Sequence, residues 1–167
     1  MVAETTTAAD ARRRGLLVFV GSLLALPPAA AEAPLELALQ ASDGLPVLGD
    51  GSARAIYLDF WASWCAPCRL SFPWMNEMHD RHAERGLRIV AVGLDRREDD
   101  ARRFVEQTRP RFPIALDPSA VSARRLDVQA MPSSFLFSAG GLLLHGHRGF
   151  RLEDRAELER RLQAAVA

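Results

Sequence analysis

DFWASWCAPC, residues 59–68, contains both cysteines of this 167-residue chain. The residues that lead into it, 54–62, are almost all apolar, a pattern that predicts a buried β-strand. Residues 65–86 follow as a long helix that ends at Gly86, because glycine commonly ends helices. Both thiols are therefore expected where a strand ends and its helix begins, which is where open α/β sheets usually place a functional site.

Two cysteines three positions apart make a poor structural staple. A disulfide between Cys65 and Cys68 closes a loop of only a few residues, so it removes little entropy from the unfolded chain. The chain has no further cysteine with which a distant segment could be joined. A purely structural role is therefore disfavoured.

The same pair resembles half of a zinc site, because His79 and His82 repeat the spacing of two residues between ligands. The residues between Cys68 and His79 have a helical pattern, however, and a helix separates them by roughly 16 Å along its axis. One ion cannot bridge that distance. We therefore expect no metal, and we place both histidines on an exposed, solvated helix face.

The spacing suits a redox-active disulfide. At the first residue of a helix, the sulfur of Cys65 lies beside unpaired backbone N–H groups and the positive end of the helix dipole, which stabilise a thiolate. Cys68 lies one turn further on, within disulfide reach and more buried. Cys65 is therefore the expected attacking thiol and Cys68 the resolving thiol. Pro67 is tolerated because it occupies the first helical turn.

The remaining chain predicts a mixed α/β domain. Residues 54–94 form one strand–helix–strand unit with a right-handed crossover. A shorter hairpin, residues 35–49, precedes this unit. The other expected elements are a second buried strand at 87–95, a helix at 98–109, a strand at 112–117, a short helix at 119–127, a hairpin of 132–138 with 142–150, and a helix at 152–166.

The motif at 59–68 resembles the active site of thioredoxins. Pro73 occupies the position of the proline that kinks the corresponding thioredoxin helix, and the stretch AMPSSFLF resembles the cis-proline loop, with Pro132 as that proline. The extra helix and strand between residues 95 and 117 are similar to those of exported thiol–disulfide reductases of the TlpA/ResA type. The resemblance covers residues 35–167. It implies a thioredoxin fold, a central mixed sheet flanked by helices, with an N-terminal β-hairpin and an inserted helix–strand element.

The resemblance also implies the site residues. Cys65 and Cys68 are the expected catalytic pair, and Asp59 is expected to take the proton of Cys68. Its place in an apolar strand predicts burial, which raises a carboxyl pKa and suits the group to proton transfer. Many proteins of this type have asparagine there and glutamate at the position of Ser71, and thioredoxins usually place a lysine near the acid, whereas this chain contains no lysine. The substrate is expected to bind along Trp64, Ala66, Pro67, Met131 and Pro132.

The first 33 residues have the pattern of a secretory signal peptide. Arginines at 12–14 precede an apolar run at 16–26, and Ala31-Glu32-Ala33 supplies an A-x-A cleavage site. The run is short for a permanent membrane span, which needs about 20 apolar residues, and an uncleaved anchor is the alternative. We expect cleavage after Ala33, export to a bacterial periplasm and a mature thioredoxin-like domain at 34–167.

Composition and chemistry together bound the expected partners. A formal net charge of zero, from 21 basic and 21 acidic residues, gives no basic surface for nucleic acid. Protein disulfides are the expected substrates of a monomer that needs no cofactor beyond its own disulfide. Because the periplasm is oxidising, a reductase there needs electrons from a membrane thiol transporter of the DsbD/CcdA type.

Two other functions would use the same cysteines. A dithiol oxidase stabilises its reduced thiolate more strongly, typically with a histidine between the cysteines. Ala66 and Pro67 supply neither charge nor side-chain donor, which favours a potential of about −270 mV over about −120 mV. A copper-handling binding protein would use both thiols as soft ligands. The physiological substrate stays open among apocytochrome c, a copper-site assembly protein and misoxidised proteins in general.

Overall fold

The sheet that carries the site has five strands. The computed structural model describes residues 51–167, and its strands are β1 Ala55–Trp61, β2 Leu87–Gly93, β3 Ile114–Leu116, β4 Ser133–Ser138 and β5 Leu143–Arg148. They lie in the order β3-β2-β1-β4-β5. β1 and β3 are each parallel to β2, whereas β4 is antiparallel to β1 and to β5. The predicted mixed sheet is therefore confirmed.

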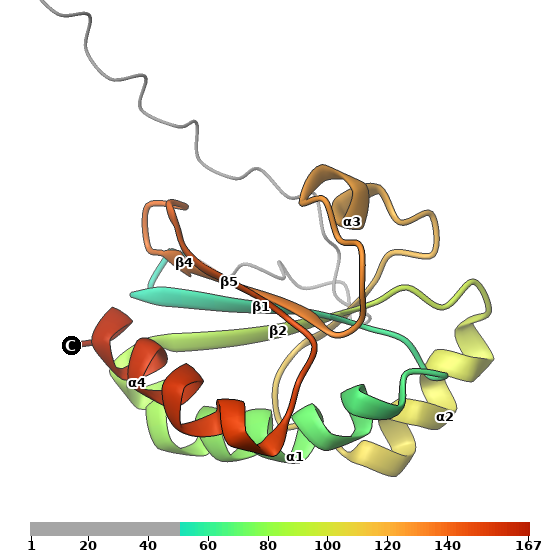
Figure 1. The fold of residues 1–167 in the computed structure, drawn as a ribbon, viewed down its shortest axis with the longest axis horizontal. Helices are drawn as coiled ribbons and strands as arrows, with labels where there is room; N and C mark the ends of the chain where they lie inside the picture. The colour runs from blue at the N-terminus through green and yellow to red at the C-terminus, as the bar shows by residue number, and fades with distance from the viewer. Residues whose placement is uncertain (1–50) are drawn as a thin grey trace, which may run out of the picture. The chain divides into compact units, whose positions relative to one another are not determined.

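Helices cover both faces of this sheet. The described residues contain the α-helices α1 Ala66–His82, α2 Glu98–Thr108, α3 Val121–Arg125 and α4 Arg155–Ala165, and the 3₁₀ turns η1 Ala83–Arg85 and η2 Leu152–Asp154. Figure 1 shows α1, α2 and α4 on one face of the sheet and α3 on the other. The continuous apolar character of β1 and β2 is explained by this cover, because all but one residue of each strand is buried.

Alternate residues of β1 supply two separate cores. Tyr57 and Trp61 belong to the apolar cluster that includes α1, α2 and α4, whereas Leu58 and Phe60 belong to the cluster that includes α3. Side chains of a strand alternate between its two faces, so Asp59 points to the same face as Tyr57 and Trp61. The strand that leads into the cysteine motif thus places one carboxyl group on the face that α1 covers.

α1 begins at the cysteine motif and ends close to the predicted position. Cys65 is its N-cap residue, Pro67 lies in its first turn and Pro73 lies inside it. The chain continues through η1 and turns at Gly86, whose φ of 96° lies in the left-handed region that favours glycine. A Cβ there would also lie 2.9 Å from Cγ of Arg54, so this position has no room for a side chain.

The inserted elements, α2 and β3, belong to the main core. Phe104 of α2 stacks on Trp61 with ring centroids 4.5 Å apart, and it meets Phe72 of α1 edge-on at 4.9 Å. Aromatic pairs at these distances stabilise a fold beyond the area they bury. The insertion therefore supports the same layer of the molecule that carries the cysteines.

The expectation of an exposed His82 is wrong. Only 3% of its surface is exposed, because α4 packs against the end of α1 and brings Glu159 to 3.9 Å from its Nε2 atom. Burial is the larger of the effects that lower the pKa of His82. His79 is half-buried and its ring contacts that of Phe112.

Two predictions fall on residues that the structure does not describe. They are the signal peptide at 1–33 and the hairpin at 35–49. Within residues 51–167, no helix combines the length and the apolar character that a membrane span requires.

Candidate active site

The two cysteines are bonded to each other at the start of α1. The backbone N–H of Cys68 donates a hydrogen bond to Sγ of Cys65, with a nitrogen–sulfur distance of 3.3 Å. The sulfur thus occupies the place of the side-chain oxygen that commonly caps a helix. In a reduced protein, this N–H group and the helix dipole would stabilise a thiolate on Cys65.

Exposure distinguishes the two cysteines only slightly. Cys65 is 4% exposed and Cys68 is fully buried. Cys65 is therefore the outer of the two residues, as its position at the helix start predicts, but in the disulfide form it too is largely covered.

Asp59 is the buried acid that the sequence predicts. Only 2% of its surface is exposed, and its Oδ2 atom has no hydrogen-bond partner among the described residues. Burial raises the pKa of Asp59 well above its ordinary value, because removal from water disfavours the charged form. Such a group can hold a proton at a pH at which an exposed carboxyl group is ionised.

Two hydroxyl side chains lie on the same face as Asp59. Ser134 is its direct partner across the β1–β4 pair, and Tyr57 precedes it by two residues on β1. The pKa of Tyr57 is raised first by burial and further by the negative charge of Asp59, while a hydrogen bond with Ser134 lowers it. Tyr57 therefore stays protonated and remains a hydrogen-bond donor beside the acid.

The residues next to the disulfide form an exposed rim. Trp64 is 72% exposed, and Ala66 and Pro67 are also exposed. Trp61, by contrast, is fully buried, so the two tryptophans of the motif have separate roles in core and surface. The exposed rim therefore lies directly beside the largely covered sulfur atoms.

The loop before β4 completes this end of the sheet. β4 runs antiparallel to β1, and Ser133 at its start pairs with Phe60 near the end of β1. Pro132 therefore lies beside the end of β1 that leads to the cysteines. The Met131–Pro132 peptide bond is cis, and Met131 packs against the apolar cluster that contains both cysteines.

Comparison with known proteins identifies the family of this chain. A family model described as Redoxin matches residues 29–162, which is most of the chain. The chain belongs to the Redoxin family. This redoxin is 30% identical over 110 residues to the thiol-disulfide oxidoreductase ResA of Bacillus thuringiensis subsp. konkukian, a match that covers 66% of this chain and 64% of the relative. The chain thus spans 64% of the length of that relative.

Solved structures agree with this assignment. A thiol:disulfide interchange protein DsbE from Chlorobium tepidum is 43% identical, with a TM-score of 0.74 and coverage of 77% of this chain and 92% of that one. StoA from Bacillus subtilis, at 22% identity, shares the fold with a TM-score of 0.63 and coverage of 74% and 92%. The expected thioredoxin fold and the resemblance to TlpA/ResA-type proteins are confirmed.

Ser71 occupies the position at which many TlpA/ResA-type proteins have a glutamate, and it cannot serve as an acid in its place. It is 1% exposed, and its hydroxyl donates a hydrogen bond to the carbonyl oxygen of Cys68 at 3.1 Å. A serine hydroxyl bonded in this way is no proton acceptor at neutral pH. Asp59 is thus the acid that β1 itself supplies on the face covered by α1.

Sequence reasoning missed one contact of the loop between β1 and α1. Both oxygens of Asp95 accept hydrogen bonds from Ser63, two residues before Cys65. The signal was present, because Asp95 follows β2 and the carboxyl ends of neighbouring parallel strands meet at one edge of a sheet. The position of Asp95 was predicted, but its contact with Ser63 was not.

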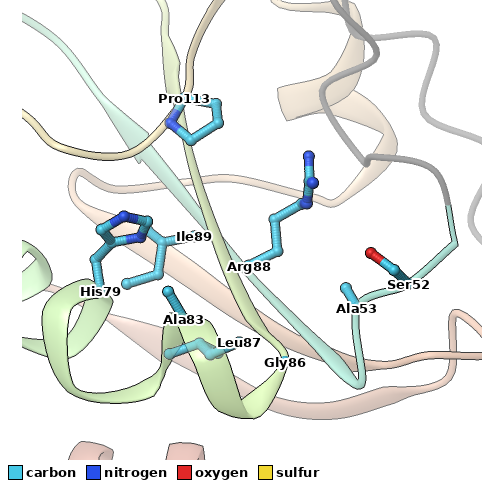
Figure 2. Close-up of a pocket in the computed structure, with 9 residues that line it drawn as sticks. All are labelled: Ser52, Ala53, His79, Ala83, Gly86, Leu87, Arg88, Ile89 and Pro113. Carbon is cyan, nitrogen blue, oxygen red and sulfur yellow. The ribbon is translucent and has the colours of Figure 1, made fainter.

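A cavity of about 320 Å³ lies elsewhere in the molecule. Figure 2 shows His79 and Ala83 of the α1–η1 segment on one side of it, with Arg88 and Ile89 of β2 beside them. These residues lie at the end of α1 and the start of β2, whereas the disulfide lies at the start of α1. The cavity is therefore not part of the candidate active site.

Among the described residues there is also no group of three or more histidine, cysteine and acidic side chains placed to hold a metal ion.

Proposed function

We propose that this redoxin is an exported thiol–disulfide oxidoreductase that acts mainly as a reductase of protein disulfides. The observation that carries the proposal is the position of Cys65 as the N-cap of α1, with the N–H of Cys68 directed at its sulfur. A thiolate in that position is stabilised and is the attacking species in thiol–disulfide exchange.

The first chemical step is an attack by the Cys65 thiolate on one sulfur of a substrate disulfide. A bond forms between Cys65 and that sulfur, and the other substrate sulfur leaves as a thiolate. The helix N-terminus favours this step because it holds the attacking sulfur in its charged form near neutral pH.

The second step releases the substrate. Cys68 transfers its proton to the ionised form of Asp59 and attacks the sulfur of Cys65 in the mixed disulfide, so the remaining substrate sulfur leaves as a thiolate. The substrate has gained two electrons, and the enzyme holds the Cys65–Cys68 disulfide present in the structure. Asp59 suits this transfer because its raised pKa makes it a better proton acceptor than an ordinary carboxylate.

The exposed rim and the cis-proline loop are the proposed substrate site. Trp64, Ala66 and Pro67 offer a surface beside the sulfur atoms. We place the substrate backbone in an extended conformation along Met131 and Pro132, with main-chain hydrogen bonds of the β type to Met131. Main-chain hydrogen bonds do not depend on the substrate's side chains, which suits an enzyme that acts on different proteins.

The direction of the reaction determines which electron donor the protein needs. A reductase that works in an oxidising compartment has to be recharged, and we assign this role to a membrane thiol transporter of the DsbD/CcdA type. Export through residues 1–33, a monomeric state and the absence of any cofactor besides the disulfide complete the proposal. Mass spectrometry of periplasmic protein should find a mature N-terminus at Pro34.

The direction is tested by the reduction potential. Equilibration of the protein against glutathione redox buffers should give a value near that of thioredoxin, about −270 mV. A value near −120 mV, typical of strong oxidants, would assign the opposite direction. Titration of the reduced protein with copper(I) against a competing chelator tests the alternative of a copper-handling binding protein. Tight copper binding without reductase activity would favour that alternative over a reductase.

The role of Asp59 is tested by a pH–rate profile. Asp59→Asn keeps the shape of the side chain but cannot accept the proton of Cys68. We expect slower turnover of a model protein disulfide near neutral pH and partial recovery at higher pH, where Cys68 ionises without help. Superimposable profiles of the two proteins would remove Asp59 from the mechanism.

A further inference from the structure

Asp95 places both of its carboxylate oxygens on one residue of the loop that carries the cysteines. It follows the end of β2, and only 7% of its surface is exposed. Its Oδ2 accepts a hydrogen bond from the backbone N–H of Ser63 at 2.8 Å, and its Oδ1 accepts one from the Ser63 hydroxyl at 2.7 Å. Two bonds to one residue fix its orientation as well as its position.

The carbonyl oxygen of Ser63 also has a side-chain partner. Nη2 of Arg69 donates a hydrogen bond to it at 3.2 Å. The guanidinium group is itself held in place, since Nη1 donates to Oε1 of Gln107 at 2.9 Å and its carbon lies 4.9 Å from the ring centre of Phe104. The N–H, O–H and C=O groups of Ser63 are therefore all bonded, although the residue lies in a loop.

The position of this loop matters for the sulfur of Cys65. Ser63 precedes Cys65 by two residues, and the N–H of Cys65 bonds to the carbonyl oxygen of Ala62 at 3.0 Å. The contact that stabilises the thiolate, from the N–H of Cys68 to the sulfur, weakens steeply when distance or angle departs from its optimum. A loop that shifts at Ser63 would move the sulfur away from the start of α1.

We propose that Asp95 and Ser63 are positioning residues that hold the Cys65 sulfur at the N-terminus of α1 and so keep its thiolate stable. The role of this thiolate in catalysis rests on the proposed function. Asp95 acts through the hydrogen bonds and not through its charge, because a carboxylate near a thiolate would by itself destabilise that thiolate. Loss of the bonds and loss of the charge therefore change the pKa of Cys65 in opposite directions.

This opposition defines the experiment. Alkylation of Cys65 by iodoacetamide is followed against pH in the reduced protein, with peptide mass spectrometry to identify the labelled cysteine. Ser63→Ala removes one hydrogen bond and keeps the charge of Asp95, and we expect a higher apparent pKa of Cys65 and alkylation at neutral pH slower by about 3- to 10-fold, the value of one hydrogen bond. Ser63→Thr keeps a hydroxyl and should restore the wild-type profile. Asp95→Asn should also raise the pKa.

Three outcomes would overturn the proposal. A lower pKa of Cys65 in Asp95→Asn would mean that the carboxylate acts through its charge. A Ser63→Ala protein that is less stable in urea but keeps the wild-type alkylation profile would mean that the contact serves the fold alone. The third is a Ser63→Thr protein that behaves as Ser63→Ala does.

The alkylation profile needs no substrate, and this separates the present proposal from the proposed function. A wild-type protein that fails to reduce any protein disulfide contradicts the proposed function, while the pKa comparison still tests the positioning role. An active wild-type protein whose Ser63→Ala variant has an unchanged pKa contradicts the positioning role alone.

Discussion

Replacement of Asp59 by asparagine should make the protein more stable than wild type, by a difference in unfolding free energy that grows as the pH rises. The side chain is 2% exposed, its Oδ2 has no partner among the described residues, and burial raises its pKa above the ordinary value of 3.8. The folded state therefore holds a proton that the unfolded chain releases above pH 3.8. Each pH unit between that value and the folded-state pKa costs the wild-type protein about 1.4 kcal/mol of unfolding free energy.

The sign follows from which state binds more protons. A group with a raised pKa contributes stability that is complete below its unfolded pKa and is lost as the pH rises through its folded pKa. Asparagine does not titrate, so the stability of Asp59→Asn relative to wild type should increase by about 1.4 kcal/mol per pH unit from pH 4 upward and level off once Asp59 has ionised.

Asp117 provides the matched control, because it is a second buried aspartate near the end of a strand. Burial raises its pKa, but hydrogen bonds from Ser122 and from the backbone of Val121 and Ser122 outweigh this effect, and the net pKa is lowered. Its contribution to stability is lost only as the pH falls below the ordinary value. Asp117→Asn should therefore be less stable than wild type by an amount that does not change above pH 5.

Urea denaturation of the oxidised proteins between pH 4.5 and 9 measures these differences, and the disulfide keeps the cysteines from titrating. Asp59→Asn should diverge from wild type with rising pH, and Asp117→Asn should run parallel to it. A constant difference between Asp59→Asn and wild type across the whole range would show that Asp59 is ionised throughout. It would also refute the argument from burial.

Three further predictions concern buried residues elsewhere in the domain. Phe104→Ala should lose about 3–5 kcal/mol of unfolding free energy in urea, because the ring is 1% exposed and stacks on Trp61; a loss below about 1 kcal/mol would contradict a core role for the insertion. Burial lowers the pKa of His82, so its contribution to the unfolding free energy should fall as the pH drops below 6.5, where the unfolded chain takes up the proton first; His82→Gln should therefore gain stability in urea relative to wild type from pH 7.5 to 5.5. Gly93→Ala should cost about 1–3 kcal/mol, because its Cβ would lie 2.9 Å from the ring of Trp61, whereas Gly140→Ala, with its nearest neighbour at 3.9 Å, should melt close to wild type.

The positions of Cys65 and Asp59 can be predicted from the sequence. The position of Cys65 at a helix start follows from an apolar run, a proline in the first turn and a glycine at the far end, all of which act over a few residues. The burial of Asp59 is predictable for the same reason, because apolar residues on both sides of it leave the strand no exposed face. Both features depend on residues that are close in the sequence, so the sequence alone is enough to predict them.

The errors and omissions involve contacts between distant residues. The helical pattern alone predicts an exposed His82, because the cover comes from α4, where Glu159 lies. The bond between Ser63 and Asp95 joins two loops that meet only once β1 and β2 have paired. A sequence predicts that such ends come together, but the side chains that meet there depend on loop conformations that no periodic pattern specifies.

β1 is an interior strand, paired with β2 on one side and with β4 on the other. Backbone groups in such a strand become accessible to water only when the sheet itself opens. Asp59 therefore cannot exchange its proton with solvent through local fraying of an edge. The side chain of Asp59 faces the layer of α1, which also carries the two sulfur atoms. In the proposed mechanism, the proton of Cys68 and the substrate sulfur are therefore handled on one face of the sheet, and a substrate bound over the disulfide would cover that face.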